Sequence, residues 1–261
     1  MKNLVGKKII LFGGAGFIGH NLAIELKKRG AIPIIVDSLD VNNMGYLISN
    51  LDDNPINELY IKFVDERLRI IRENKIKIEV LDVRNYHAVC RVLDKHDPDA
   101  LVHLAAVSHA NRSNKDPYNT FDHSVRTLEN ALDACKNKHV HFVYFSSSMV
   151  YGDFGDGSAH EEMVCNPKGI YGALKYSGEK IIAAYNQVFG LEYTIIRPSA
   201  LYGQRCVSRR VGQAFIENAM MGKDLTINGD GTSKLDFTYI QYLIEGTCCV
   251  LASPTARGEI F

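Results

Sequence analysis

A tyrosine and a lysine four residues apart, Tyr171 and Lys175, are the side chains of this sequence best suited to acid–base chemistry. Residues at positions i and i+4 share one face of a helix, so a phenol and an ammonium lie side by side here. A free phenol has a pKa of ~10, and a neighbouring ammonium lowers that value toward the range of a useful base. In the run Ser146-Ser147-Ser148, a serine hydroxyl can hold a substrate oxygen while Tyr171 takes its proton. The ordinary alternatives are a surface helix pair and a serine-rich turn.

A glycine-rich segment near the start, GGAGFIG at positions 13–19, has the pattern of a pyrophosphate-binding turn. Gly13 permits the tight turn, Gly16 lets the backbone approach the phosphates, and Gly19 allows close packing of the following helix. The N–H groups of that helix then point at the phosphates. Asp37, at the end of the second predicted strand, would bond the adenosine ribose hydroxyls and repel a 2′-phosphate. The sequence therefore predicts NAD rather than NADP, although Asp37 taken alone is also a common turn residue.

Two later strand ends complete the predicted cofactor site. Asp82 and Val83 close the third strand, where an acid can meet the adenine amino group. The segment Leu104-Ala105-Ala106 closes the fourth strand, where small residues let the backbone approach the cofactor. Ligands of open α/β sheets lie outside the carboxyl ends of the strands, so both segments are suitably placed. The alternative for Asp82 is a helix cap for the segment that begins at Asn85.

The elements that must position these residues alternate between strand and helix patterns, which indicates βαβ units around a parallel sheet. Strands are predicted at Lys8–Phe12, Ile32–Val36, Ile76–Leu81, Ala100–Leu104, His141–Ser146 and Tyr193–Arg197. We expect an α/β fold with a Rossmann-type doubly wound parallel sheet. Residues 1–197 are assigned to an NAD-binding domain and residues 198–261 to a smaller substrate lobe, with segments of the two interleaved. A long polar insertion, Asn42–Arg72, is expected to be partly helical from Asn57 onward.

Composition excludes several functional classes. The chain has 261 residues with 30 basic and 30 acidic side chains, so its charge suggests neither a nucleic-acid nor a membrane partner. No apolar run approaches the ~20 residues that a membrane span requires, and no leader is apparent, which predicts a cytoplasmic protein. The six cysteines and nine histidines show no spacing typical of a metal site, so no metal is expected.

Seven segments together resemble the NAD-dependent epimerase/dehydratase family of extended short-chain dehydrogenases/reductases, with most similarity to UDP-glucose 4-epimerases. They are Gly13–Gly19, Asp82-Val83, His103–Ala106, Ser146–Gly152, Tyr171–Lys175, Arg197–Gly203 and Asp236–Tyr239. The resemblance implies Ser147, Tyr171 and Lys175 as catalytic residues. It implies cofactor contacts from Gly13, Gly16, Phe17, Ile18, Gly19, Asp37, Asp82, Val83, Leu104, Ala105, Ala106, Ser146, Tyr171, Lys175 and Pro198.

The resemblance also implies a reaction. Tyr171 as phenolate removes the proton of a sugar 4-hydroxyl while carbon 4 gives a hydride to the nicotinamide; the 4-keto sugar turns over and the hydride returns to its opposite face. Sugar-nucleotide 4,6-dehydratases carry an Asp–Glu pair at the positions of Ser148 and Met149, so a dehydratase is disfavoured here. The alternatives are a sugar-nucleotide 4-reductase or other oxidoreductase, a dehydratase on the same scaffold, and a catalytically weak NAD-binding protein.

The substrate lobe departs from the family pattern. Ala200 and Leu235 replace the Asn and Arg that are usual there, and Gln241 and Tyr242 replace acidic residues. His123 and Arg126 replace Asn and Gly. Ser148, Met149 and Arg209 are the predicted substrate contacts. Arg205, Arg209 and Arg210 could supply positive charge for a diphosphate, and the alternative is a solvated basic surface.

Further expectations concern the substrate, the assembly and the end of the chain. Family members usually continue past the final segment 258–261, so a truncated substrate lobe is expected. The expected substrate is a nucleotide-diphosphate sugar, with UDP favoured, and the expected role is supply of polysaccharide precursors. A homodimer is expected through helices near 117–136 and 171–189, although those helices can also simply pack on the sheet.

Overall fold

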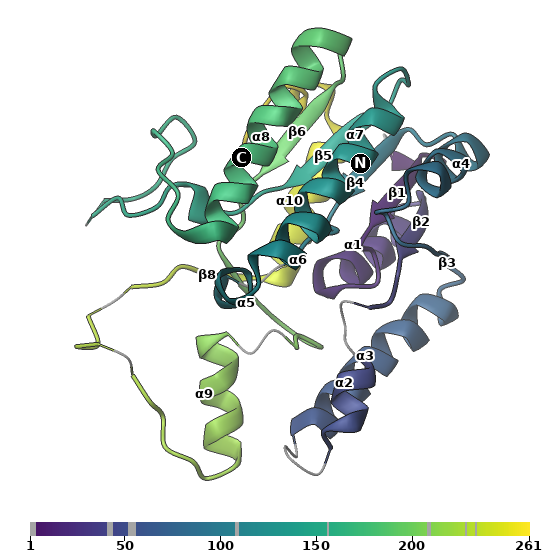
Figure 1. The fold of residues 1–261 in the computed structure, drawn as a ribbon. Coiled ribbons are helices and arrows are strands. Elements are labelled where there is room, and N and C mark those ends of the chain that lie inside the picture. Colours follow the sequence, from purple (N-terminus) through teal and green to yellow (C-terminus); the bar gives the residue numbers. More distant parts are fainter. Residues whose placement is uncertain are drawn as a thin grey trace.

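A six-stranded parallel sheet forms the centre of the computed structural model, which describes residues 4–40, 44–51, 56–107, 110–155, 157–207, 210–227, 229–232 and 234–261 (Figure 1). The strand order is β3-β2-β1-β4-β5-β6. The bounds are β1 Lys8–Phe12, β2 Ile32–Asp37, β3 Lys77–Val80, β4 Ala100–His103, β5 His141–Phe145 and β6 Tyr193–Ile196. All six predicted strands are present, and the expected Rossmann-type α/β fold is confirmed.

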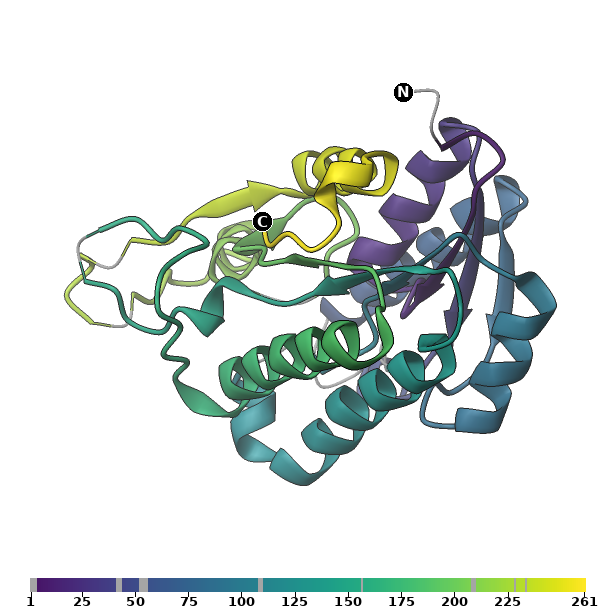
Figure 2. The ribbon, with the colours of Figure 1, turned by 90° about the horizontal axis from the view of Figure 1, so that it is seen from above.

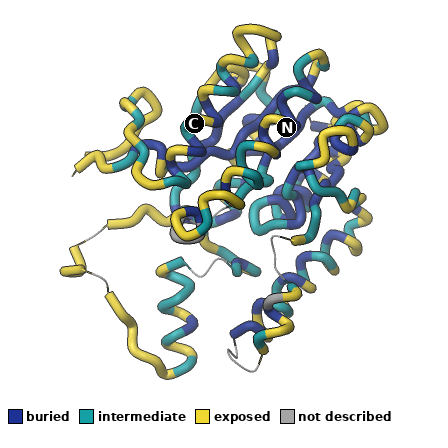
Figure 3. Tube along the Cα trace, in the orientation of Figure 1, coloured by how far each residue is buried: buried dark blue, intermediate teal, exposed yellow. Residues whose placement is uncertain are grey.

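Helices cover both faces of the sheet (Figure 2). One face carries α1 (Phe17–Lys28) and α10 (Ile240–Ala252), and the other carries α4 (Tyr86–His96), α7 (Thr127–Cys135) and α8 (Gly169–Phe189). Successive strand residues point to opposite faces, so Ile9 and Leu11 pack toward α1 while Ile10 and Phe12 pack toward α4 and α7. Burial on both faces explains why these strands are almost continuously apolar, and it makes the sheet the most buried part of the chain (Figure 3).

The strand order reverses direction between β1 and β4. The chain leaves β1 toward β2 on one side, and β4, β5 and β6 follow on the other side. In open parallel sheets the crevice for a ligand lies at the carboxyl ends of the strands beside such a reversal. The segments after β1, β4 and β5 therefore meet at one edge, as the sequence predicts for the glycine turn and the serine run.

The last part of the chain is divided between two locations. A parallel pair, β7 (Ala200–Tyr202) and β8 (Phe237–Tyr239), lies beside the main sheet with α9 (Val211–Met220) in the segment between them. The chain then returns to the main sheet, where α10 packs against α1 and Ile260 bridges to Ile195 of β6. Among the described residues, no helix is long and apolar enough to cross a membrane.

The polar insertion after β2 folds into α2 (Met44–Ser49) and α3 (Ile56–Glu73), and α3 contacts α9 of the second part. The Tyr60 hydroxyl donates to Glu217 Oε1 at 2.6 Å in a buried position, and Gln213 Nε2 donates to the same oxygen at 2.7 Å. Arg67, which is fully buried, donates from Nε to the Arg205 carbonyl at 3.0 Å. The insertion thus links the main sheet to the segment that holds α9.

Between β4 and β5 the chain forms α5 (Ala110–Lys115), α6 (Pro117–Phe121) and a π-helical turn, Asp122–Arg126, which runs directly into α7. Asp116 caps α6 by accepting from the Asn119 backbone N–H at 3.3 Å. Thr127, the first residue of α7, directly follows this turn, and its hydroxyl lies 2.8 Å from the His123 carbonyl oxygen and 3.1 Å from the Ala105 carbonyl oxygen. These contacts attach the turn to the segment after β4.

Candidate active site

The glycine turn after β1 leaves no room for side chains. Gly13 has φ +76°, and a Cβ there would lie 2.9 Å from the Ala105 backbone nitrogen. A Cβ on Gly19 would lie 2.5 Å from the Cα of Gly14. The turn therefore packs against the end of β4 and against the first turn of α1, where Phe17 and Ile18 are partly exposed. Free amides at the start of a 12-residue helix and an open backbone surface fit the pyrophosphate of a dinucleotide.

Asp37 supports this turn. It is buried, with 6% of its surface exposed; its Oδ2 accepts from the Ala15 N–H at 2.9 Å and its Oδ1 from the Leu39 N–H at 2.8 Å. Burial raises the pKa of the carboxyl, and the two backbone hydrogen bonds act in the opposite direction. The carboxylate connects the end of β2 to the glycine turn, and its bonding to a ribose stays a prediction.

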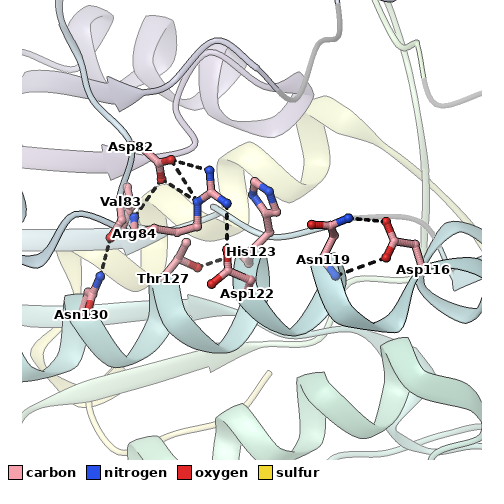
Figure 4. A network of polar contacts seen from close by, with 9 residues as sticks. All are labelled: Asp82, Val83, Arg84, Asp116, Asn119, Asp122, His123, Thr127 and Asn130. Carbon is pink, nitrogen blue, oxygen red and sulfur yellow. Dashed lines mark hydrogen bonds and ion pairs between the residues drawn. The ribbon is translucent and has the colours of Figure 1, made fainter.

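Asp82 lies at the end of β3, as predicted, but its carboxylate is engaged by a residue that the sequence reasoning missed (Figure 4). Arg84 Nη2 donates to Asp82 Oδ2 at 2.6 Å. The capping role suggested as an alternative for Asp82 belongs to Asn85, whose side chain accepts from the Ala88 N–H at 3.1 Å. The spacing Asp-x-Arg was the available signal for this ion pair.

The three predicted catalytic residues meet at the carboxyl end of β5. Tyr171 lies in the first turn of α8, with Ser147 close enough to affect its acidity. Lys175 lies one turn later and is buried; its Nζ is 6.0 Å from the centre of the Tyr171 ring and 4.9 Å from that of Tyr144. The same Nζ donates to the Phe145 carbonyl at 2.6 Å, which fixes the ammonium at the end of the strand.

The environment changes the acidity of both titratable groups of this site. Burial lowers the pKa of Lys175 to about 8, while the charge of Glu179 acts to raise it. Burial raises the pKa of Tyr171, whereas the nearby Ser147 hydroxyl and the charge of Arg210 act to lower it and so favour the phenolate.

A buried ion pair between Arg197 and Glu179 adjoins the site and was not predicted from the sequence. Arg197 donates from Nε to Glu179 Oε1 at 2.9 Å and from Nη2 to Oε2 at 2.6 Å, and both side chains are less than 5% exposed. The Ser146 hydroxyl, a predicted cofactor contact, donates to Glu179 Oε1 at 2.5 Å. Arg197 also donates to the Tyr151 hydroxyl at 3.1 Å. Glu179 is two helical turns beyond Tyr171 on the same face, which was the signal that could have identified it.

The remaining predicted residues lie around this edge. Ser148 and Met149 form a short 3₁₀ turn after Ser147; the Ser148 N–H donates to the Pro198 carbonyl at 3.0 Å, and Met149 is exposed. Val83 is buried, whereas Leu104, Ala105 and Ala106 are partly exposed. The predicted substrate contact Arg209 lies outside the described residues.

Arg205 points to α1 and α3. Its Nε donates to His20 Nε2 at 3.1 Å and its Nη1 lies 3.3 Å from Glu66 Oε1. Among the described residues, no group of three or more His, Cys, Asp or Glu side chains is arranged to hold a metal ion.

A doubly wound parallel sheet, a glycine turn beside the strand reversal and a Ser–Tyr–Lys set at the same edge define a dinucleotide-dependent enzyme of the short-chain dehydrogenase/reductase type. Residues 9–261 match the profile of the NAD-dependent epimerase/dehydratase family, and the chain belongs to this family. The expectations of an enzyme and of NAD as its cofactor are thereby confirmed.

Known proteins similar to this chain include both epimerases and dehydratases. An uncharacterized UDP-glucose epimerase of Bacillus subtilis is 30% identical over 97% of this chain and 75% of its own length. A dTDP-glucose 4,6-dehydratase of Haemophilus influenzae is 26% identical over 93% of this chain and 70% of its own. A crystal structure of UDP-glucuronic acid 4-epimerase from Bacillus cereus, in complex with NAD and UDP-4-deoxy-4-fluoro-glucuronic acid, superposes with a TM-score of 0.83 at 27% identity, covering 97% of this chain and 76% of that chain.

Proposed function

We propose that this protein is an NAD-dependent nucleotide-sugar 4-epimerase with Ser147, Tyr171 and Lys175 as its catalytic residues. The observation that carries the proposal is that Ser147 lies close enough to Tyr171 to affect its acidity, beside the buried ammonium of Lys175. The two residues after Ser147 supply neither an acid nor a base, because they are a serine and a methionine. A dehydration that removes water across carbons 5 and 6 needs both groups, so epimerisation is favoured over dehydration.

The chain's residues divide the proton chemistry among them. Tyr171 takes the proton of the sugar 4-hydroxyl and later returns it. Ser147, which lies near Tyr171, holds the reacting oxygen within reach of the phenol. Lys175 places a positive charge near the phenol and stabilises the phenolate once it forms. The glycine turn, Asp82 and Val83 would hold NAD, which would supply the hydride acceptor and donor.

The nature of the sugar nucleotide and of the assembly is also proposed. UDP-sugars are favoured because the B. subtilis and B. cereus relatives are named for them. The homodimer remains proposed through α6, α7 and α8, where Tyr118, Val188 and Phe189 are exposed apolar side chains. A cytoplasmic location and a role in polysaccharide precursor supply are consistent with this chemistry.

The test is NMR of UDP-, dTDP- and GDP-sugars incubated in deuterated water with the protein and NAD. A sugar inverted at carbon 4 without deuterium there supports the proposal, because the hydride has then stayed on the enzyme. Deuterium at carbon 5 with loss of oxygen indicates a dehydratase, and net change in the cofactor indicates an oxidoreductase. No conversion, together with NAD binding, favours a non-catalytic role.

The chain offers a matched control for its proposed base. Tyr171→Phe is expected to lower turnover by at least about 100-fold, the usual effect of a lost acid–base group, while NAD still binds. Tyr176 and Lys180 repeat the same spacing one residue past Lys175, and their side chains form a cation–π contact of 5.0 Å. Tyr176→Phe should leave turnover within about twofold, and equal loss in the two variants would contradict the assignment of Tyr171.

A further inference from the structure

Arg84 holds the carboxylate of Asp82 in a bidentate ion pair (Figure 4). Its Nε lies 2.9 Å from Oδ2 and 3.1 Å from Oδ1, and its Nη2 lies 2.6 Å from Oδ2. The backbone N–H of Arg84 donates to Oδ1 at 2.9 Å. A planar guanidinium that meets a carboxylate through two nitrogens fixes its orientation as well as its charge.

The other end of the same guanidinium is anchored on the π-helical turn. Arg84 Nη1 donates to Asp122 Oδ2 at 2.7 Å, and Asp122 is the first residue of that turn. Asn130, on α7, donates to the Val83 carbonyl at 2.9 Å. The loop after β3 is therefore attached at two points to one helix, as Figure 4 shows. Single π turns inside helices are rare and occur frequently at functional sites.

The hydrogen bonds from Arg84 leave part of the acceptor capacity of the Asp82 carboxylate unused. An ionised carboxylate has about four acceptor positions. Three N–H groups of Arg84 bond the carboxylate: the Nη2–H and the backbone N–H each meet one oxygen, and the Nε–H is shared between both. About one position is left on a side chain that is 39% exposed. An adenine amino group donates one such hydrogen bond, whereas a carbonyl oxygen at the same place would meet a carboxylate oxygen and be repelled.

We propose that Arg84, anchored by Asp122, is a positioning residue that orients Asp82 to accept the adenine amino group of the cofactor. The proposal rests on the proposed function, since it requires a dinucleotide at this edge of the sheet. It assigns to the Arg84–Asp122 pair a role in selecting the base of the cofactor, apart from the catalytic Ser147, Tyr171 and Lys175.

The experiment compares the binding of NAD and of nicotinamide hypoxanthine dinucleotide, in which a carbonyl replaces the adenine amino group, by isothermal titration calorimetry. The wild type should prefer NAD by about tenfold. Arg84→Gln should reduce this preference to about twofold or less, mainly by weakening NAD. Asp122→Asn, which keeps the bidentate pair but loosens its anchor, should give an intermediate ratio. Arg91→Gln, on the exposed face of α4, is the matched control and should keep the wild-type ratio.

The outcomes separate the possible roles. Equal weakening of both dinucleotides by Arg84→Gln, with an unchanged ratio, would make Arg84 merely structural and overturn the proposal. A wild type that binds both dinucleotides equally would also overturn it, because Asp82 would then not recognise the amino group. A wild type that binds neither would refute the dinucleotide site itself. If circular dichroism shows that Arg84→Gln does not fold, Asp122→Asn decides: an unchanged ratio overturns the proposal and a reduced ratio supports it.

Discussion

Replacing Glu179 with glutamine should destabilise the protein far more than the same change on the surface. The substitution removes the negative charge that Arg197 contacts through two hydrogen bonds, and the arginine side chain is only 4% exposed. Leaving one partner of a buried ion pair uncompensated costs about 3–5 kcal/mol. For a chain of 261 residues, each kcal/mol shifts the melting temperature by about 2–4 °C, so a loss of roughly 6–20 °C is expected.

The chain provides the control for this measurement. Glu58 accepts from Lys62 at 2.6 Å, but both side chains are more than 60% exposed. Glu58→Gln should therefore change the stability very little, because water screens an exposed ion pair. Urea denaturation followed by circular dichroism measures both variants under the same conditions. A difference of less than about 1 kcal/mol between the two would show that water screens the Glu179–Arg197 pair and would refute the reasoning.

A second consequence concerns Lys175. The charge of Glu179 raises the pKa of that ammonium, which burial has brought down to about 8. Without this charge the pKa falls further, so Glu179→Gln should lose activity at the alkaline end at a lower pH than the wild type. The pH profile of turnover tests this. If the wild type and Glu179→Gln lost activity at the same alkaline pH, the charge of Glu179 would not be setting the pKa of Lys175.

Three further predictions follow from buried groups and from the glycine turn. His103 is fully buried with no hydrogen-bond partner on either ring nitrogen among the described residues, and burial lowers its pKa from 6.5 to about 3. Below pH 6.5 the unfolded chain binds more protons than the folded chain, so the free energy of unfolding decreases as the pH is lowered. His103→Phe should recover about 2 kcal/mol of the loss between pH 7 and pH 5 in urea titrations, and an unchanged pH dependence would contradict this. Tyr60→Phe should cost about 1.5–3 kcal/mol by removing the buried bond to Glu217, with faster hydrogen exchange in α9; unchanged exchange would argue against the link. Gly13→Ala should abolish NAD binding by calorimetry because φ is +76° and the Cβ would meet Ala105, whereas Gly45→Ala, where the Cβ meets nothing, should bind NAD normally.

The elements of the fold were predictable from the sequence because each buried strand leaves a local pattern. Strands such as Lys8–Phe12 are apolar on both faces, and glycines that tolerate no Cβ mark the turn that follows. The meeting of Ser147 with Tyr171 was predictable for the same reason, since parallel strands end at one edge of the sheet. Local pattern and global architecture agree at these positions.

What the sequence did not reveal depends on partners that are distant in the chain. Glu179 and Arg197 look like ordinary charged residues until β6 and α8 are packed together, and then they form a buried pair. Arg205 was a candidate for diphosphate binding by its charge, but in the structure it contacts His20 and Glu66. A charge count cannot distinguish a guanidinium that faces a ligand from one that ties two segments together.

The contact between α3 and α9 restricts how the substrate lobe can be exchanged between relatives. A chimera that imports residues 198–227 from another enzyme would bring a new α9 against the old α3, and the buried hydroxyl of Tyr60 would then face whatever residue replaced Glu217. The insertion that carries α3 and the lobe segment that carries α9 must therefore be exchanged together, although about 140 residues separate them in the chain. To change the substrate of this enzyme, residues 44–73 should be transferred together with the substrate lobe.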